Sequence, residues 1–174
     1  MEVDGLTPSL ALVKSVLERV SIPIKVMIRP RQGDFHYSKS ELLKMTGSIY
    51  SMKDLAVYGV VFGMLNKYRG VDFINTASLA EIAKPLNVTF HKAIDYSTNI
   101  LESTKILSNI SSVDAILTSG AKPTANDGIP TINKMIELSE NKLDIIAAGK
   151  ITKDNLHVLK EKIQTNSFHG RKIV

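Results

Sequence analysis

Apolar and polar residues follow two alternating patterns along this chain. Short apolar runs bounded by turn residues are typical of strands buried in a sheet, and the segments between them repeat apolar residues with the period of a helix. Because strand and helix alternate throughout, the pattern predicts right-handed crossovers and a parallel sheet covered on both faces. The predicted helices are residues 7–20, 38–57, 72–83, 100–110, 129–139 and 152–163, and the predicted strands are residues 23–28, 60–65, 87–91, 114–118, 143–148 and 167–169.

Polar residues at the starts of three predicted helices support these boundaries. Thr7 is a candidate N-cap followed by Pro8, and Ser38 and Thr152 begin two later helices. In the helix at 38–57, Leu43 is among the apolar residues that we expect to face inward.

The residues that follow the strands indicate the fold class. A doubly wound nucleotide-binding sheet normally carries a glycine-rich phosphate loop after its first strand, and the sequence has neither that motif nor a Walker A motif. Polar residues instead follow nearly every strand, which is typical of a TIM-like (β/α) barrel. We therefore predict an α/β fold of this type that is incomplete, with about six of the eight strand–helix units.

Composition limits the chemistry. The 174 residues are enough for one domain with a real core, and the hydrophobic share of 44% is ordinary for a soluble globular protein. There is no Cys, which excludes disulfides, thiolate catalysis and thiolate metal sites. No signal-peptide pattern and no apolar segment of membrane-spanning length are present, so we expect a cytoplasmic protein with no membrane partner.

The net charge of +5 raises the question of a nucleic-acid partner. The lysines, however, stand beside glutamates along the predicted helices, as Lys44 does beside Glu41. No dense basic run carries interleaved aromatic residues, and aromatic residues make up only 6% of the chain. The pattern predicts a solvated surface of mixed charge and no nucleic-acid partner.

The strand ends carry the candidate chemistry. Arg29 follows the strand at 23–28, where its guanidinium could bind a carboxylate or phosphate; the alternative is that it pairs with Asp34 or another carboxylate to hold the loop. Arg31 and Asp34 are interpreted as organisers of that loop. His91 ends the strand at 87–91, where a ring directed into the barrel mouth would act as a general acid/base or metal ligand, and Asp95 would orient it. A histidine satisfied by a neighbouring carboxylate, without turnover, is the alternative.

Three later positions suggest anion binding. Ser119 and Gly120 follow one strand and Gly149 follows the next, where barrel loops often bind phosphate through backbone amides; simple tight turns are the alternative. Lys92 is a candidate Schiff-base amine, but strand alternation would direct it opposite to His91, toward the helices.

Five sequence blocks occur in an order that resembles a known family: Gly-Leu-Thr-Pro-Ser at 5–9, Met-Ile-Arg-Pro-Arg-x-Gly-Asp-Phe-x-Tyr-Ser at 27–38, Val-Phe-Gly at 61–63, Val-Thr-Phe-His-Lys-Ala-Ile-Asp at 88–95 and Leu-Thr-Ser-Gly at 117–120. Together they resemble the CutC family, named for a proposed role in copper homeostasis. The resemblance implies a cytoplasmic TIM-like barrel with a possible bound copper ion. It also matches His169 to a strand-end histidine of the family, which makes His91 and His169 candidate metal ligands. Lys150 departs from a position where the family usually has a more glycine-rich loop.

The resemblance also implies a shortened domain. Family members begin with a strand, a helix and a second strand ahead of the block at 5–9, and this chain stops soon after His169. We therefore expect residues 1–174 to form a single domain that is truncated at the N-terminus and at the C-terminus. Open sheet edges would then lead to self-association as a homo-oligomer, or leave the fold marginally stable.

Three functional hypotheses remain open. A copper-binding role follows from the resemblance, although Cu(I) prefers soft sulfur ligands and Met45 and Met52 are spaced as core residues. A small-molecule enzyme acting on an anionic, for example phosphorylated, substrate would use Arg29, His91, Asp95 and Ser119 at one rim. An inactive remnant is the third reading.

Overall fold

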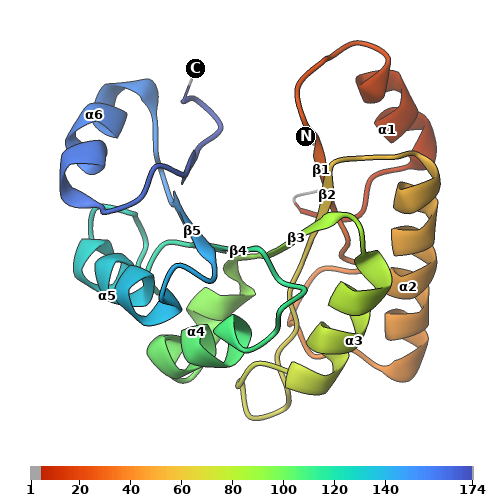
Figure 1. Cartoon of the computed structure of the whole chain (residues 1–174), viewed down its shortest axis with the longest axis horizontal. Helices are drawn as coiled ribbons and strands as arrows, with labels where there is room; N and C mark the ends of the chain where they lie inside the picture. The colour runs from red at the N-terminus through yellow and green to blue at the C-terminus, as the bar shows by residue number, and fades with distance from the viewer. Residues whose placement is uncertain (1–4, 174) are drawn as a thin grey trace.

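Six parallel strands form a curled half-barrel with helices on its outer side in the computed structural model, which describes residues 5–173 (Figure 1). Each strand pairs with the next along the chain, in the order β1 to β6. The predicted incomplete TIM-like barrel is confirmed. The elements are α1 (Leu10–Leu17), β1 (Lys25–Met27), α2 (Lys39–Asp54), β2 (Gly59–Phe62), α3 (Phe73–Ala83), β3 (Asn87–Phe90), the 3₁₀ helix η1 (Lys92–Tyr96), α4 (Ile100–Ser108), β4 (Ala115–Thr118), α5 (Ile129–Ser139), β5 (Asp144–Ala148), α6 (Lys153–Lys162) and β6 (Phe168–His169).

Side chains near the helix ends determine where the helices begin. Ser38 and Glu41 form a capping box at the start of α2, in which each side chain accepts a hydrogen bond from the other's backbone amide. The predicted N-cap at Thr7 is wrong, because Ser9 caps α1. Thr7 instead binds the end of β1: its amide donates to the Arg29 carbonyl over 3.0 Å, and its hydroxyl accepts the Arg29 amide over 2.8 Å.

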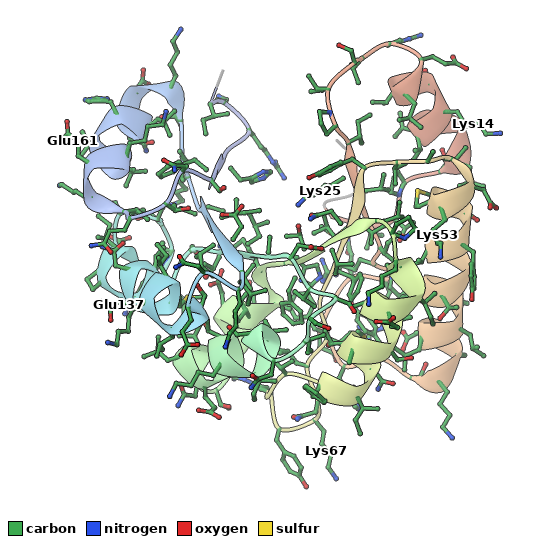
Figure 2. All side chains as sticks on the ribbon, in the orientation of Figure 1. Lys14, Lys25, Lys53, Lys67, Glu137 and Glu161 are labelled. Carbon is green, nitrogen blue, oxygen red and sulfur yellow. The ribbon has the colours of Figure 1, made fainter. Side chains whose placement is uncertain are left out.

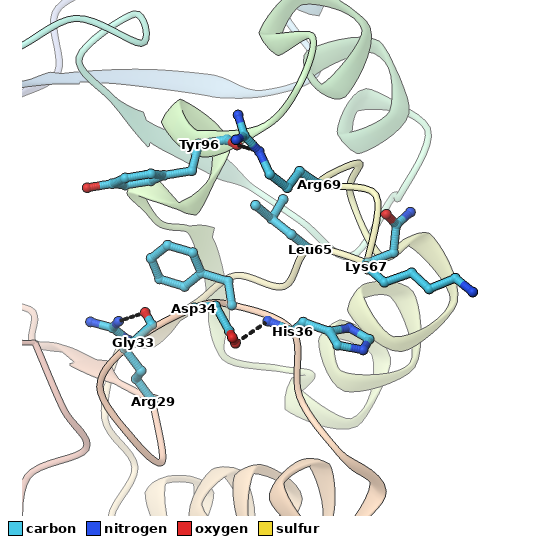
Figure 3. A pocket seen from close by; sticks show the side chains of 10 residues that line it. Arg29, Gly33, Asp34, His36, Leu65, Lys67, Arg69 and Tyr96 are labelled. Atoms are coloured by element: carbon cyan, nitrogen blue, oxygen red, sulfur yellow. Dashed lines mark hydrogen bonds between the residues drawn. The ribbon is translucent and has the colours of Figure 1, made fainter.

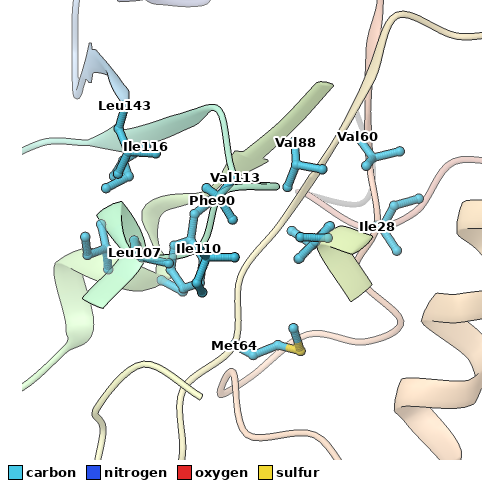
Figure 4. Close-up of a cluster of buried hydrophobic side chains, with 14 of the residues drawn as sticks. Ile28, Val60, Met64, Val88, Phe90, Leu107, Ile110, Val113, Ile116 and Leu143 are labelled. Carbon is cyan, nitrogen blue, oxygen red and sulfur yellow. The ribbon is translucent and has the colours of Figure 1, made fainter. Parts of the chain in front are cut away.

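The core lies between the sheet and its helices. Phe62 and Phe90 point to the helix side and are fully buried, and each such side chain contributes about 1.5–3 kcal/mol of burial free energy. Met45 and Met52 pack inward from α2 as expected, whereas Leu43 is 72% exposed and does not face the core. Figure 4 shows part of this core: Phe90 and Ile116 lie near Leu107 of α4 and Ile110, which follows it. Ile28, Val60 and Val88 lie together on the other side of the same cluster.

The opposite face of the sheet is open in the described part of the chain. Met27, Val61, Leu117 and Ile146 on this face are only partly buried, so the prediction of a sheet covered on both faces is wrong for residues 5–173. Figure 2 places Lys25 on this open side, and its ammonium group donates to the Thr89 hydroxyl over 2.8 Å.

The parallel topology brings all the strand carboxyl ends to one rim, which is where the candidate residues lie. At the two ends of the sheet, β1 pairs only with β2 and β6 only with β5 among the described strands. Self-association through these edges stays a prediction. None of the described helices is both long and apolar enough to cross a membrane.

Candidate functional site

Two pockets with no lining residue in common occupy the rim, and the 3₁₀ helix η1 contributes to both. We call the first the aromatic pocket: a cavity of about 600 Å³ lined by Arg29, the loop 33–36, Leu65, Asn66, Lys67, Arg69 and Tyr96. We call the second the basic pocket: a cavity of about 440 Å³ lined by Lys92, Leu117, residues 148–152 and residues 169–172. Of the residues expected to act together at the rim, Arg29 lines the aromatic pocket and Gly149 the basic one, whereas His91, Asp95, Ser119 and Gly120 line neither.

Aromatic side chains build the first pocket. The rings of Phe35 and Tyr96 lie 5.6 Å apart at an angle of 48°. Figure 3 shows Tyr96 and Arg69 on one wall, where Arg69 donates to the Tyr96 carbonyl over 3.0 Å, and Arg29 with Gly33 on the opposite wall. The guanidinium carbon of Arg29 lies 4.8 Å from the Phe35 ring centre, a cation–π contact.

Arg29 has no carboxylate partner within residues 5–173. Its Nη2 donates to the Gly33 carbonyl over 2.8 Å, and its buried Nε has no hydrogen-bond partner. The suggested pairing of Arg29 with Asp34 is wrong, because Asp34 binds Arg31 at 2.8 Å. Arg31 also binds Glu41 at 2.5 Å, so the interpretation of Arg31 and Asp34 as loop organisers is confirmed. A partly buried cation is thus left free to take an anion.

His91 does not point into an open barrel mouth. It is 4% exposed, its ring lies 5.1 Å from that of Phe35, and Gly63 leaves room for it, since a Cβ there would lie 2.6 Å from its Nδ1. Nδ1 accepts the Ala93 amide over 3.1 Å, which assigns the proton of the neutral ring to Nε2, and that atom has no partner. Burial, and secondarily the charge of Arg29, lowers the pKa of His91 to about 4, so the ring is neutral near pH 7.

Asp95 does not orient His91. Its carboxylate accepts the Thr118 hydroxyl over 2.5 Å, the Ser119 amide over 3.0 Å and the Ala121 amide over 3.0 Å, and it pairs with Lys92 at 2.9 Å. Only 7% of the Asp95 side chain is exposed. This buried carboxylate ties η1 to the loop after β4, which is a structural role.

The predicted anion donors Ser119 and Gly120 are already engaged by that arrangement. The Ser119 amide and hydroxyl contact Asp95, and the Gly120 amide donates to the Thr118 hydroxyl over 2.9 Å. An external anion would therefore have to displace Asp95 to reach them. Gly149 alone of the three predicted positions lines a pocket, the basic one, and its φ of +112° is a conformation that other residues resist.

Lys92 lies at the rim instead of facing the helices. The expectation assumed that strand alternation continued, but β3 ends at Phe90 and the chain turns into η1. Lys92 donates to the Ser119 hydroxyl over 2.5 Å and lines the basic pocket together with His169. Desolvation, followed by the charges of Arg171 and Lys92, lowers the pKa of His169.

The described residues do not form a metal centre. Between residues 5 and 173, no three or more His, Asp or Glu side chains gather closely enough to hold an ion. His91 and His169, the expected ligands, lie in different surroundings: His91 among the rings of Phe35 and Phe90, His169 in the basic pocket.

Comparison with known proteins identifies the family. The family model described as "CutC family" matches residues 1–174. The chain belongs to the CutC family. The resemblance seen in the five sequence blocks is confirmed.

Individual CutC relatives agree over nearly the whole chain. The CutC family protein of Aliivibrio fischeri is 37% identical across 97% of this chain, and the human copper homeostasis protein cutC homolog is 36% identical across 95%. The chain spans 69% and 60% of the length of these two relatives. A crystal structure of the CutC protein from Streptococcus agalactiae superposes with a TM-score of 0.92 at 27% identity, covering 99% of this chain and 85% of that one.

Sequence reasoning missed the residues that give each pocket its character. The sequence analysis did not single out Phe35 and Tyr96 of the aromatic pocket, or Arg171 and Lys172 of the basic pocket. Yet Gly170-Arg171-Lys172 follows the last strand in the same way as Gly149-Lys150 follows the strand before it. A glycine followed by a cation at two successive strand ends was the available signal for the basic pocket of this CutC chain.

Proposed function

We propose that this CutC chain serves in copper homeostasis, in the cytoplasm, by binding a small organic anion in the aromatic pocket. Curated relatives carry the name copper homeostasis protein, which supports the biological role. The physical chemistry of the described residues favours an anionic ligand over a metal ion held by the protein itself.

The observation that carries the proposal is the charge of Arg29, which pairs with no carboxylate among residues 5–173. A partly buried guanidinium without a counterion is costly, and a bidentate carboxylate or phosphate would relieve that cost. Thr7 fixes the Arg29 backbone on one side, and the Phe35 ring supports its guanidinium on the other. Arg29 is therefore positioned for a ligand before the ligand arrives.

The remaining walls indicate what the anion is attached to. Phe35, Tyr96 and Leu65 offer an apolar surface, and Lys67 and Arg69 add positive charge at its edge. A flat or aromatic body bearing one carboxylate or phosphate matches this combination of surfaces. His91 and Asp95 are enclosed and engaged, so we propose binding and assign no reaction.

Direct copper binding through His91 and His169 is the second candidate. The buried Nε2 of His91, which has no partner, is the observation that favours it. The positive charge around His169 opposes it, because Lys92 and Arg171 would repel a cation there.

Titration of the purified chain with benzoate and phenyl phosphate, followed by calorimetry and thermal shift, tests the proposal. Arg29→Gln should weaken binding about 10- to 100-fold, since hydrogen bonds to a charged group are worth about 1.5–3 kcal/mol. Arg29→Lys should recover only part of the affinity, because an ammonium group lacks the bidentate fork.

The matched control is Arg19→Gln, which removes an exposed arginine outside the pocket and should leave the affinity unchanged. Cu(I) and Cu(II) are titrated in parallel on the wild type and on His91→Ala. Stabilisation by copper that His91→Ala abolishes, with no response to either organic anion, would replace this proposal by the second candidate.

A further inference from the structure

We propose that the basic pocket is a second, separate ligand site, which binds a dianionic phosphate group. It shares no lining residue with the aromatic pocket and does not rest on the function proposed for that pocket.

Cationic side chains from separate parts of the chain converge on this cavity. Lys92 follows β3, Lys150 follows β5, and Arg171 and Lys172 follow β6; His169 of β6 also lines the cavity. No acidic side chain is among the residues of 5–173 that line the cavity. The segment 170–173, dark blue in Figure 1, is held at the start of α6, because the Lys153 amide donates to the Lys172 carbonyl over 2.8 Å.

Lys150 and Lys172 place like charges at one cavity, and an anion would relieve their repulsion. The inner lining is apolar, with Leu117, Ala148 and Ile151, and a low-dielectric wall strengthens the repulsion between like charges at the rim. The lowered pKa of His169, caused first by desolvation and then by Arg171 and Lys92, is consistent with charges close enough to repel one another. A dianion would turn this repulsion into attraction.

The neighbouring loop offers an internal precedent. The amides after β4 and the Lys92 ammonium already surround one anion, the Asp95 carboxylate. That carboxylate pairs with Lys92 at 2.9 Å and does not line the pocket. Lys150 and Lys172 line the pocket and form no ion pair among residues 5–173, so both are available to a ligand that enters from solvent.

The backbone makes the cavity rigid and limits its size. Gly149 has a φ of +112°, and a Cβ there would lie 2.9 Å from the Cβ of Ser119, so the end of β5 packs tightly against the loop after β4. Lys150 follows with a φ of 54°, in the left-handed region. The cavity of about 440 Å³ is large enough for a phosphate ion or a small phosphomonoester.

Calorimetric titration with inorganic phosphate and with glycerol 3-phosphate tests the site, against potassium chloride at equal ionic strength and against glycerol. Both phosphates should bind, and neither control should. Lys150→Ala should weaken binding about threefold and Lys150→Ala with Lys172→Ala about tenfold, since each removes one exposed ion pair. Lys150→Glu should weaken it further by reversing the charge.

Two control variants separate this site from the rest of the molecule. Lys160→Ala removes an exposed lysine of α6 outside the pocket and should leave phosphate binding unchanged. Arg29→Gln removes the anion-binding side chain of the aromatic pocket, so the phosphate binding that remains in this variant, and its loss when Lys150 and Lys172 are also replaced, belongs to the basic pocket. If glycerol 3-phosphate binds more tightly than inorganic phosphate, the ligand is a phosphate ester. If the two bind equally, the ligand is the free phosphate ion. No binding above the chloride control, or unchanged affinity in the double variant, would overturn the proposal.

Discussion

The aromatic pocket and the basic pocket stand at the same rim and are built on opposite principles. In the aromatic pocket the guanidinium of Arg29, which has no carboxylate partner among residues 5–173, lies against a ring and beside apolar walls. In the basic pocket cations from three strand ends line a cavity with an apolar floor, and His169 supplies the only ring among the described lining residues. In the two proposals, the apolar walls of the first pocket would select the body of a ligand, and the cations of the second would select its charge.

The two pockets differ because η1 turns between them. Its first residue, Lys92, points into the basic pocket, and its last, Tyr96, lines the aromatic one. Asp95, between them, is bound to the loop after β4. The five-residue 3₁₀ helix thus places Lys92 and Tyr96 in two separate pockets, whereas a continued strand would have placed successive side chains on alternate faces of the sheet.

The largest expected effect comes from breaking the connection between the pockets. Asp95→Ala leaves the Thr118 hydroxyl and the amides of Ser119 and Ala121 without their acceptor in a buried position. We expect the free energy of unfolding to fall by about 3–5 kcal/mol, the usual cost of removing one partner from a buried charged network. Urea denaturation measures it, and Asp95→Asn should lose less because it keeps the shape. A loss below about 1 kcal/mol would show that the pockets do not depend on this carboxylate.

A fall in pH should lower the free energy of unfolding through His91, which lies beside Phe35 of the aromatic pocket. The pKa of His91 is about 4 in the folded chain and has its ordinary value of 6.5 in the unfolded chain. Between these two pH values the unfolded chain therefore binds a proton that the folded chain does not bind. Stability is therefore complete above pH 6.5 and is lost as the pH falls toward 4, by about 3 kcal/mol in total.

Urea denaturation at a series of pH values, on the wild type and on His91→Gln, measures this loss. The variant should lack most of it, and His157→Gln, which changes an exposed histidine of α6, should retain it. Equal pH profiles for the wild type and His91→Gln would rule out His91 as the source.

The smallest of the three effects concerns the wall of the basic pocket. Gly149→Ala adds a Cβ at a φ of +112° and only 2.9 Å from the Ser119 Cβ, so we expect a loss of about 1–3 kcal/mol in stability together with weaker phosphate binding. Gly47→Ala is the control: it lies in α2 with nothing within 4 Å of the added Cβ and should raise stability by about 0.5–1 kcal/mol. An unaffected Gly149→Ala variant would show that this wall is less tightly packed than the structure indicates.

Local pattern was sufficient for the elements and the fold class. Apolar residues that repeat every two or every 3.6 residues reveal which strands and helices bury one face. Helix caps such as Ser38 act on backbone groups only a few residues away. Both signals can therefore be recognised without the tertiary structure. The five sequence blocks were likewise enough to indicate the CutC family, and the family comparison agrees. Arg31 and Asp34 were interpreted correctly for the same reason, since they lie three residues apart.

The candidate site depended on contacts that no local pattern encodes. Whether His91 and Lys92 face the rim or the helices depends on where β3 stops, and whether Asp95 serves His91 or the loop after β4 depends on a chain segment more than twenty residues away. Arg29 first stood out as one arginine in a polar loop after a strand. The sequence by itself determined that Arg29 follows a strand of a CutC barrel. Only the tertiary structure decided that no carboxylate of residues 5–173 pairs with it, because pairing depends on which distant carboxylates the fold brings within reach.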